Sequence, residues 1–275
     1  MGNFYSTQRL DNILCDGVNH TVEGLLSPEV LDSVEYILFT ESVTLNVNSS
    51  MVFKKLKTID YAESDEEGNK VTITVVGECR LFMGSDFNGD ISGWNMSGVT
   101  DTSAMFMNSK FNGDISSWDM SGVKNMKHMF KKSMFDGDIS EWNVSGVTNM
   151  LSMFHYSKFN QDISTWDTSI VKTMSMMFQN SVFDKDISKW DVSSVTDMSY
   201  MFCESKFNQN ISSWNVSNVT NMWYMFGSSK FNQDISAWNV SKVTKMGFMF
   251  NRSSFKQNLN RWDTTNVKDM WGMFR

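Results

Sequence analysis

Tryptophan recurs along the chain at a strict interval of 24 residues. The column consists of Trp94, Trp118, Trp142, Trp166, Trp190, Trp214, Trp238 and Trp262. Two Phe columns and two Met columns keep the same interval, and they contain sixteen of the 21 Phe and fifteen of the 23 Met. Because a segment of 24 residues is too short to bury these side chains by itself, successive segments must stack on one another. The interval therefore predicts a stacked-repeat protein whose Trp, Phe and Met columns form the core, rather than a cofactor or copper site.

The spacing within one repeat predicts its local structure. Ile211, Trp214 and Val216 have the L-x-x-L-x-L spacing of a leucine-rich repeat strand. We therefore expect a short parallel strand around each Trp-[Asn/Asp]-Val, with Trp and Val pointing inward. The following Val-Thr-x-Met-x-x-Met-Phe segment has three- and four-residue spacing, which predicts one or two helical or 3₁₀ turns on the opposite side. The sequence thus predicts a mainly β solenoid of leucine-rich-repeat type over residues 81–275, with about eight repeats.

The pattern FNxDISxWxVSxVTxMxxMF, which residues 231–250 match in full, resembles the BspA-like leucine-rich repeat. The similarity is to the variant common in mycoplasma-type surface lipoproteins, and it covers residues 81–275. The resemblance implies a β-solenoid, a role in surface adhesion or protein binding without catalysis, and a location at the cell surface. By contrast, the first ten residues have no apolar signal segment, and Cys15, Cys79 and Cys203 are too scattered for a disulfide framework. These two features favour an intracellular location.

Residues 1–80 do not share the 24-residue period. Ser27 and Pro28 predict the start of a helix, with Ser as N-cap and Pro at the first helical position. Segments 43–47 and 71–76 alternate as strands do. Because the open end of a solenoid exposes unpaired backbone, we expect this segment to be a small α+β cap. The alternative is an enzyme or effector activity in residues 1–80, with the repeats as a targeting arm.

Several classes of function find no support in the sequence. A net charge of −7 argues against nucleic-acid binding, and no apolar run approaches the 18 residues of a transmembrane helix. Of the three histidines, His128 and His155 lie in adjacent repeats but three residues out of register, so no shared metal site or catalytic triad is expected. We therefore expect a protein that is not an enzyme and has no cofactor or metal.

Two columns of acidic or amide residues can be interpreted either as binding sites or as parts of the fold. The column that includes Asp90, Asp114 and Asp138 could bind calcium or cap turns, and the use of Asn at two of its positions favours turn capping. A second column lies between Trp and Val and would project from the concave face of a leucine-rich sheet, where it is a candidate binding surface. Its near uniformity favours a role in the fold. Its members are Asn95, Asp119, Asn143, Asp167, Asp191, Asn215, Asn239 and Asp263.

A column that varies between repeats is the better candidate for recognition. Four consecutive repeats place large side chains at one position, and two Trp residues lie one position earlier. This candidate aromatic patch consists of Met176, Tyr200, Trp223, Tyr224, Phe248 and Trp271. If the column faces solvent, it suits a protein or glycan partner. The alternative is packing between rungs.

The two ends of the sequence suggest further hypotheses. Met1 to Ser6 match the M-G-x-x-x-[S/T] pattern for myristoylation of Gly2, and a single acyl chain would give weak membrane anchoring. The last repeat stops at Arg275 without a polar cap, so a structural protein that assembles end to end is another alternative. The sequence leaves the oligomeric state open. Our main prediction is a non-enzymatic adhesion or binding protein that presents an elongated surface to a macromolecular partner.

Overall fold

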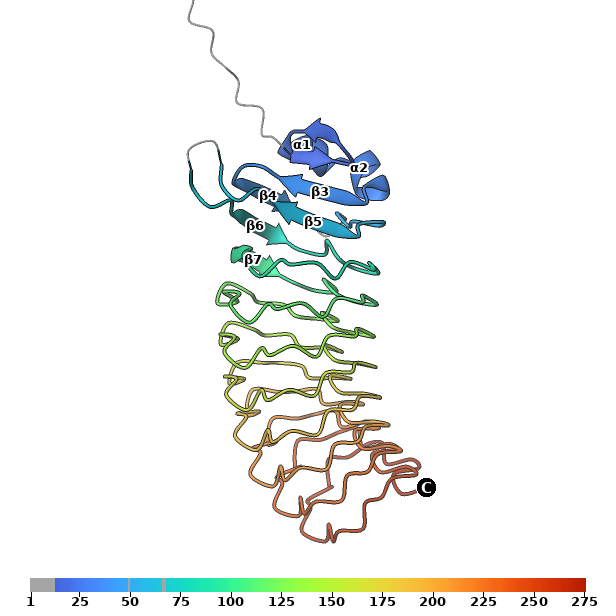
Figure 1. Ribbon diagram of the computed structural model, residues 1–275. Helices are drawn as coiled ribbons and strands as arrows, with labels where there is room; N and C mark the ends of the chain where they lie inside the picture. Colours follow the sequence, from blue (N-terminus) through green and yellow to red (C-terminus); the bar gives the residue numbers. More distant parts are fainter. Residues whose placement is uncertain (1–12, 49, 66–67) are drawn as a thin grey trace, which may run out of the picture.

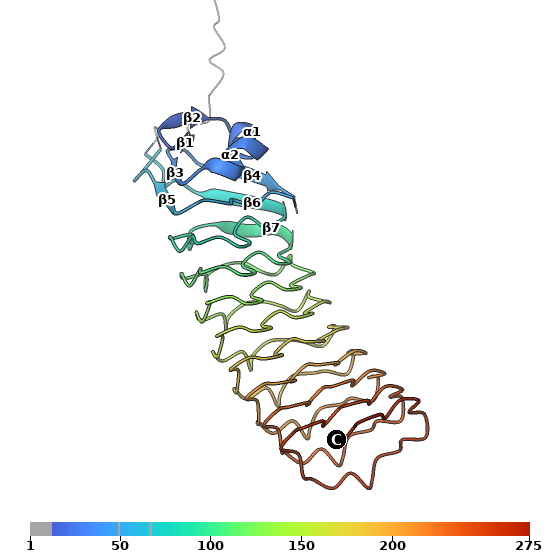
Figure 2. The same cartoon turned by 90° about the vertical axis from the view of Figure 1, so that its right-hand side faces the viewer.

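The structure is a computed structural model that describes residues 13–48, 50–65 and 68–275. The chain forms an elongated stack of coils, with the two short helices at one end and the C-terminus at the other (Figures 1 and 2). One hydrophobic core runs through the whole stack, from Ile13 to Met273.

The N-terminal end contains almost all of the regular secondary structure. In chain order the elements are β1 (Ile13–Cys15), β2 (Val18–His20), α1 (Val22–Leu25), α2 (Pro28–Ser33), β3 (Tyr36–Phe39), β4 (Val43–Val47), β5 (Thr58–Tyr61), β6 (Ile73–Glu78) and β7 (Asn95–Asp101). Ser27 is the N-cap of α2, as the sequence predicts. The predicted strand 43–47 is confirmed as β4, and the other predicted strand begins two residues late, at Ile73.

The strands form two sheets, in the orders β2-β1-β3-β5 and β4-β6-β7. The β1–β2 hairpin is antiparallel, whereas β3 pairs in parallel with β5, and β6 pairs in parallel with both β4 and β7. The parallel stacking therefore begins before residue 80 and continues into the repeats. The hairpin covers the end of the stack and satisfies the backbone groups at one edge of β3.

Beyond β7, one parallel bridge joins each 24-residue coil, or rung, to the next. The bridges connect Asp101, Asn125, Asn149, Thr173, Asp197, Asn221, Lys245 and Asp269. The predicted strand at Trp-[Asn/Asp]-Val is wrong from the second repeat onward, because the bridge lies between Thr and Met instead. A turn closes on each side of the Trp segment: Trp118 N–H donates to Ile115 O, and Ser121 N–H donates to Asp119 Oδ1. These turns leave too few residues between them for a strand.

The predicted interior is confirmed except in the last rung, where Met270 and Phe274 of the Met and Phe columns are exposed. The side chains of Trp94 to Trp238 in the Trp column are only 3% exposed. Phe rings stack from rung to rung, as with Phe106 and Phe130, whose centroids lie 5.6 Å apart with planes 4° from parallel. Each indole from Trp118 onward also donates its N–H to a carbonyl 27 residues earlier, as from Trp190 Nε1 to Ile163 O at 3.0 Å. The aromatic columns therefore supply both the apolar contact and a hydrogen bond between rungs.

The predicted helical or 3₁₀ turns are also wrong. In the second rung, the segment contains three successive β-turns, closed by hydrogen bonds from Met129 N–H to Met126 O, from Lys131 N–H to His128 O and from Ser133 N–H to Phe130 O. His128 and Lys132 have φ values of 61° and 55°. A left-handed residue cannot continue a right-handed helix, so the chain turns repeatedly instead of coiling.

Candidate functional site

The successive turns form a continuous surface along the stack, which we call the ridge. It consists of residues 103–108, 127–132, 151–156, 175–180, 199–204, 223–228 and 247–252, together with Arg80 before them and residues 271–275 after them. Within one rung, Met129 and Phe130 are buried, whereas the two residues before them and the two after them reach the surface. Side chains at these outer positions differ from rung to rung.

Two columns on the ridge have left-handed backbone at residues other than glycine. The first consists of Ala104, His128, Ser152, Met176, Tyr200, Tyr224 and Phe248, and the second of Asn108, Lys132, Tyr156, Asn180, Glu204, Ser228 and Arg252. Their φ values lie between 52° and 61°. This conformation costs about 1–2 kcal/mol for a residue with a Cβ. The first column is the variable column that the sequence singled out, so the candidate aromatic side chains lie on strained turns.

The structure brings the candidate aromatic side chains together as a strip, formed by Tyr200, Trp223, Tyr224, Phe248 and Trp271. The rings of Tyr200 and Tyr224 are stacked at 5.3 Å, and Tyr224 lies 5.4 Å from Phe248. Trp271 packs edge-on against Phe248 at 4.6 Å. Met176 occupies the next rung of the same column. The rings therefore pack between rungs and also reach the surface.

The polar side-chain atoms of Tyr200, Trp223 and Tyr224 are hydrogen-bonded within the strip and its border. Trp223 Nε1 donates to Tyr200 Oη at 3.1 Å, and Tyr224 Oη donates to Asn251 Oδ1 at 3.1 Å. Tyr200, Trp223, Tyr224 and Phe248 are half-buried, and Trp271 is 63% exposed. What remains for a partner is a preorganised surface of ring faces and edges.

The other end of the ridge is basic. Arg80, Ala104, His128 and Ser152 occupy the same column as the aromatic residues, at the N-terminal side of the stack. Burial, together with the neighbouring lysines, lowers the pKa of His155 to about 4. Sequence reasoning missed this cluster because it compared residues within columns. The turn that joins His128 to Lys131 brings positions three residues apart side by side.

The column proposed for a concave face serves the turns. No strand passes through these residues from the second repeat onward in the described chain, so they do not project from a sheet there. Each side-chain oxygen accepts the backbone N–H two residues later, as Asp167 Oδ1 does from Ser169 at 3.0 Å. The same bond is made by Asn95, Asp119, Asn143, Asp191, Asn215, Asn239 and Asp263. All eight are exposed.

The Asp90 column also caps turns, as the sequence favours. Asp90, Asp114, Asp138, Asp162, Asp186, Asn210, Asp234 and Asn258 each accept a backbone N–H two residues on. The bonds from Ser164 hold the pKa of Asp162 below its usual range. Among the described residues, no group of three or more His, Cys, Asp or Glu could hold a metal ion.

A further polar ladder was not predicted. Side-chain oxygens of Asn88, Asn112, Asp136, Asn160, Asp184, Asn208 and Asn232 each accept the backbone N–H of the residue 24 positions later. The sequence offered one signal for it, because this position is Asn or Asp in every one of these repeats. The ladder links the rungs along the face where Asn-x-Asp turns occur.

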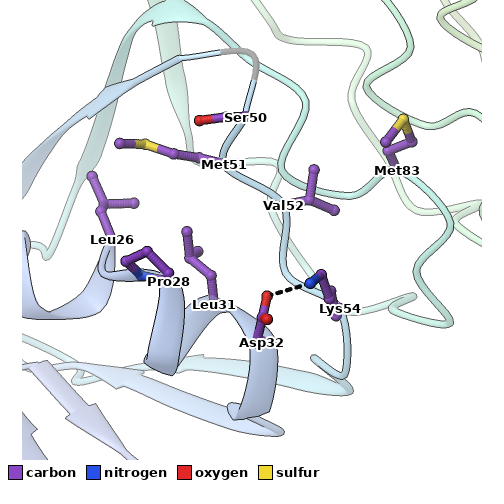
Figure 3. Close-up of a pocket in the computed structure, with 9 residues that line it drawn as sticks. All are labelled: Leu26, Pro28, Leu31, Asp32, Ser50, Met51, Val52, Lys54 and Met83. Atoms are coloured by element: carbon purple, nitrogen blue, oxygen red, sulfur yellow. Dashed lines mark ion pairs between the residues drawn. The ribbon is translucent and has the colours of Figure 1, made fainter.

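The N-terminal end contains an open pocket of about 810 Å³ (Figure 3). Its apolar lining includes Leu26 and Leu31, and Met51 and Met83 lie across from them. Asp32 and Lys54 form an ion pair of 2.7 Å at the pocket. This arrangement offers apolar contact and one charge pair. Among the described lining residues, it shows no nucleophile paired with a general base.

Gly2, the three cysteines and the helices bear on the hypotheses about the location of the protein in the cell. Gly2 lies outside the described residues. Cys15, Cys79 and Cys203 are buried free thiols, and burial raises the pKa of Cys203 to about 12. In the described part of the chain, no helix has the length and apolar character that crossing a membrane requires.

These features define a repeat protein, a mainly β stack of 24-residue rungs with a continuous aromatic interior. Within that class, the chain belongs to the family described as mycoplasma protein of unknown function, DUF285. The family model matches residues 50–155, 78–182, 109–205, 133–229 and 179–275. No curated protein and no solved structure matches the chain.

Proposed function

We propose that this protein is a non-enzymatic binding protein that holds a protein or glycan partner on the aromatic strip of the ridge. The observation that carries the proposal is the strip itself, in which each of five rings contacts at least one other ring, on a surface whose side chains vary along the stack. Aromatic side chains give large contact area at low entropic cost, and they are enriched at recognition surfaces. The strained left-handed turns beneath them hold the rings in place.

The type of repeat and the cellular role are part of the same proposal. We assign the rungs to the leucine-rich-repeat type, in its BspA-like variant, and the activity to adhesion at a cell surface. Support comes from the spacing of Ile211, Trp214 and Val216, all of which are buried in the structure. The uniform interior and the variable ridge are also typical of repeat proteins that bind macromolecules.

The test uses the left-handed backbone of the strip. Tyr200→Gly, Tyr224→Gly and Phe248→Gly together remove three rings at positions where glycine adopts the native φ without strain. Gly272 already occupies this column in the last rung. The matched control is Asn108→Gly with Ser228→Gly, which alters the second left-handed column and leaves the strip intact.

Both variants and the wild-type chain are incubated with extract of the native host and with an array of immobilised glycans, after circular dichroism has shown that each is folded. We expect a partner that wild type and control retain and the strip variant loses. If the folded strip variant captures every partner that wild type captures, the proposal is wrong.

A further inference from the structure

The basic end of the ridge concentrates unsatisfied polar atoms. Six buried side-chain nitrogen or oxygen atoms lack a hydrogen-bond partner in the described chain, and five of them lie on Arg80, His128, Ser152 and His155. Both ring nitrogens of His155 are among them. Buried polar atoms are almost always paired, so such a cluster requires an explanation.

These residues are neighbours in space. Arg80, His128 and Ser152 share one column, and small Ala104 separates Arg80 from His128. The Arg80 guanidinium reaches into the Ala104 rung, where Nη2 donates to Ser103 Oγ at 2.8 Å. Backbone bonds then join His128 to Leu151, and His155 to Ser152. The residues that carry the orphaned atoms therefore lie along one side of the stack over four rungs, from Arg80 to His155.

The charges around the two histidines are all positive. Desolvation and the charges of Lys131, Lys127 and Arg80 lower the pKa of His128 to about 4. Burial and the charges of Lys131, Lys132 and His128 likewise lower the pKa of His155 to about 4. No ion pair joins these four cations to a carboxylate in residues 13–48, 50–65 and 68–275.

The cluster gathers four cations on one part of a chain whose net charge is −7. Lys127, Lys131 and Lys132 lie in one rung, and together with Arg80 they disfavour the charged form of the two histidines. An anion would relieve the repulsion and supply acceptors for the unpaired N–H groups.

We propose that the basic end of the ridge, formed by Arg80, Lys127, His128, Lys131 and His155, is a binding site for a tetrahedral oxyanion group, a sulfate or a phosphate. The guanidinium and the two ammonium groups supply the charge, and the imidazoles supply N–H donors. Both histidines are half-buried, so rotation about the Cβ–Cγ bond presents a ring nitrogen to the ion. This site stands on its own residues and does not depend on the aromatic strip.

The proposal predicts a coupling between anion binding and proton uptake. An anion next to a histidine favours the charged imidazole, so binding raises the pKa of both rings from about 4 toward the ordinary histidine value. By linkage, sulfate binds more tightly as the pH falls through the raised pKa of the complex. Sulfate is the appropriate probe because it remains a dianion over this range, whereas phosphate titrates.

The first experiment titrates the full chain with sodium sulfate at about pH 5 and about pH 8, with sodium chloride at equal ionic strength as the reference. Histidine ring resonances in NMR spectra report the occupancy and both pKa values. We expect saturable shifts for His128 and His155, none for His20, and tighter binding at the lower pH. Shifts that chloride reproduces, or that do not saturate, would overturn the proposal.

The second experiment uses variants at half-buried lysines whose side chains make no hydrogen bond in the described chain. Lys127→Met with Lys131→Met should weaken sulfate binding by about tenfold or more. Lys206→Met, at an exposed lysine outside the cluster, should leave it unchanged. An equal loss of sulfate affinity in the Lys127/Lys131 variant and the Lys206 variant would mean a general effect of net charge and would contradict a specific site.

The third experiment tests the histidines. His128→Asn with His155→Gln keeps polar side chains that cannot gain a proton, and Asn tolerates the left-handed backbone at position 128. We expect sulfate binding to lose its pH dependence in this variant. If the dependence persists, the imidazoles do not face the ion and the proposal is wrong.

The source of the oxyanion is resolved by repeating the titration with O-phosphoserine and with a sulfated disaccharide. Tighter binding of phosphoserine assigns a phosphorylated protein, and tighter binding of the disaccharide assigns a sulfated glycan. Failure of both, together with failure of free sulfate, overturns the site. None of these outcomes affects the test of the aromatic strip, which uses different variants.

Discussion

In the interior, Phe130 lies over Phe106 and under Phe154, with ring centroids 5.6 and 5.7 Å apart and planes nearly parallel. A ridge column at the same rungs changes from Ala104 to His128 to Ser152. Repetition of one side chain suits the interior because an identical neighbour above and below fills the space equally well in every rung. The ridge has no such constraint, so its side chains are free to differ. The comparison teaches that the fold is encoded in the constant columns, whereas the variable columns are where we propose that recognition takes place.

The largest expected effect is in the interior. Trp190→Ala removes a ring that is 3% exposed and its hydrogen bond to Ile163 O, and it should lower the free energy of unfolding by about 3–5 kcal/mol. Urea denaturation followed by circular dichroism measures the change. Trp271→Ala on the ridge is the control and should cost less than about 1 kcal/mol. A loss below about 1 kcal/mol for Trp190→Ala would contradict the distinction between interior and ridge.

The left-handed turns beneath the ridge should respond to backbone preference rather than to packing. Ser228 is exposed with φ of 54°, so Ser228→Val should destabilise by about 1–2 kcal/mol, because a β-branched residue is strained there. Ser228→Gly should instead stabilise by about 0.5–1 kcal/mol. Gly84 already occupies this column at φ 69°. Equal stability of the two variants in urea would show that the turn adapts and stores no strain.

Loss of a turn cap should have a smaller effect than a β-branched residue in a left-handed turn. Asp186→Ala removes the acceptor of Ser188 N–H, at 2.8 Å, and should cost about 1 kcal/mol. Asp186→Asn keeps the acceptor and should change stability by less than about 0.5 kcal/mol. Thermal unfolding of both variants measures the difference. A matching loss in the Asn variant would mean that the charge, and not the hydrogen bond, holds the turn.

The smallest expected effect is that of acid. Hydrogen bonds from the Ser or Thr two residues later lower the pKa of Asp114, Asp119, Asp162, Asp167, Asp186, Asp234 and Asp263. A lowered pKa in the folded state contributes stability above the ordinary Asp pKa of about 4, and this contribution disappears as the pH falls through the folded value. The melting temperature should therefore drop between about pH 5 and about pH 3.

A variant with all seven of these Asp residues changed to Asn is the control for the acid effect. Asn already caps the equivalent turns, at Asn210 and Asn258 in one column and at Asn143 and Asn215 in the other, so this variant should fold. It should show a smaller drop in melting temperature over the same pH interval, because its caps do not titrate. An equal drop would assign the acid sensitivity to other groups.

The same contrast between constant and variable columns explains what the sequence could predict. Identical residues every 24 positions identify the interior without coordinates, and Asp, Asn and Ser at fixed offsets identify the caps. The position of the parallel bridge could not be predicted from the sequence, because the Ile-x-x-Trp-x-Val spacing also suits two turns that flank a short extended segment. The left-handed turns were hidden for a different reason. Tyr, Phe and Met rarely adopt positive φ, so local preference gives no sign of them.

The two candidate binding surfaces were predictable only in part. Tyr200, Tyr224 and Phe248 share a column, and alignment of the repeats brings them together. His128 and His155 do not share one, and their proximity depends on the turn that places Lys131 beside His128. Contacts between columns require the path of the backbone within one rung. The sequence does not specify this path, because several turn combinations bury the same residues.

Every indole of the Trp column from Trp118 onward donates to a carbonyl of the preceding rung, and every member of the Asn/Asp ladder accepts a backbone N–H from the next rung. A rung is therefore interchangeable with its neighbours at both of its faces. Deleting or duplicating a whole 24-residue unit would replace the lost contacts between rungs with equivalent ones. An insertion or deletion of any other length would shift the columns out of register. The distance between the basic end and the aromatic strip can therefore change in steps of one rung. Evolution could lengthen or shorten this distance by adding or removing whole repeats, without altering the rest of the fold.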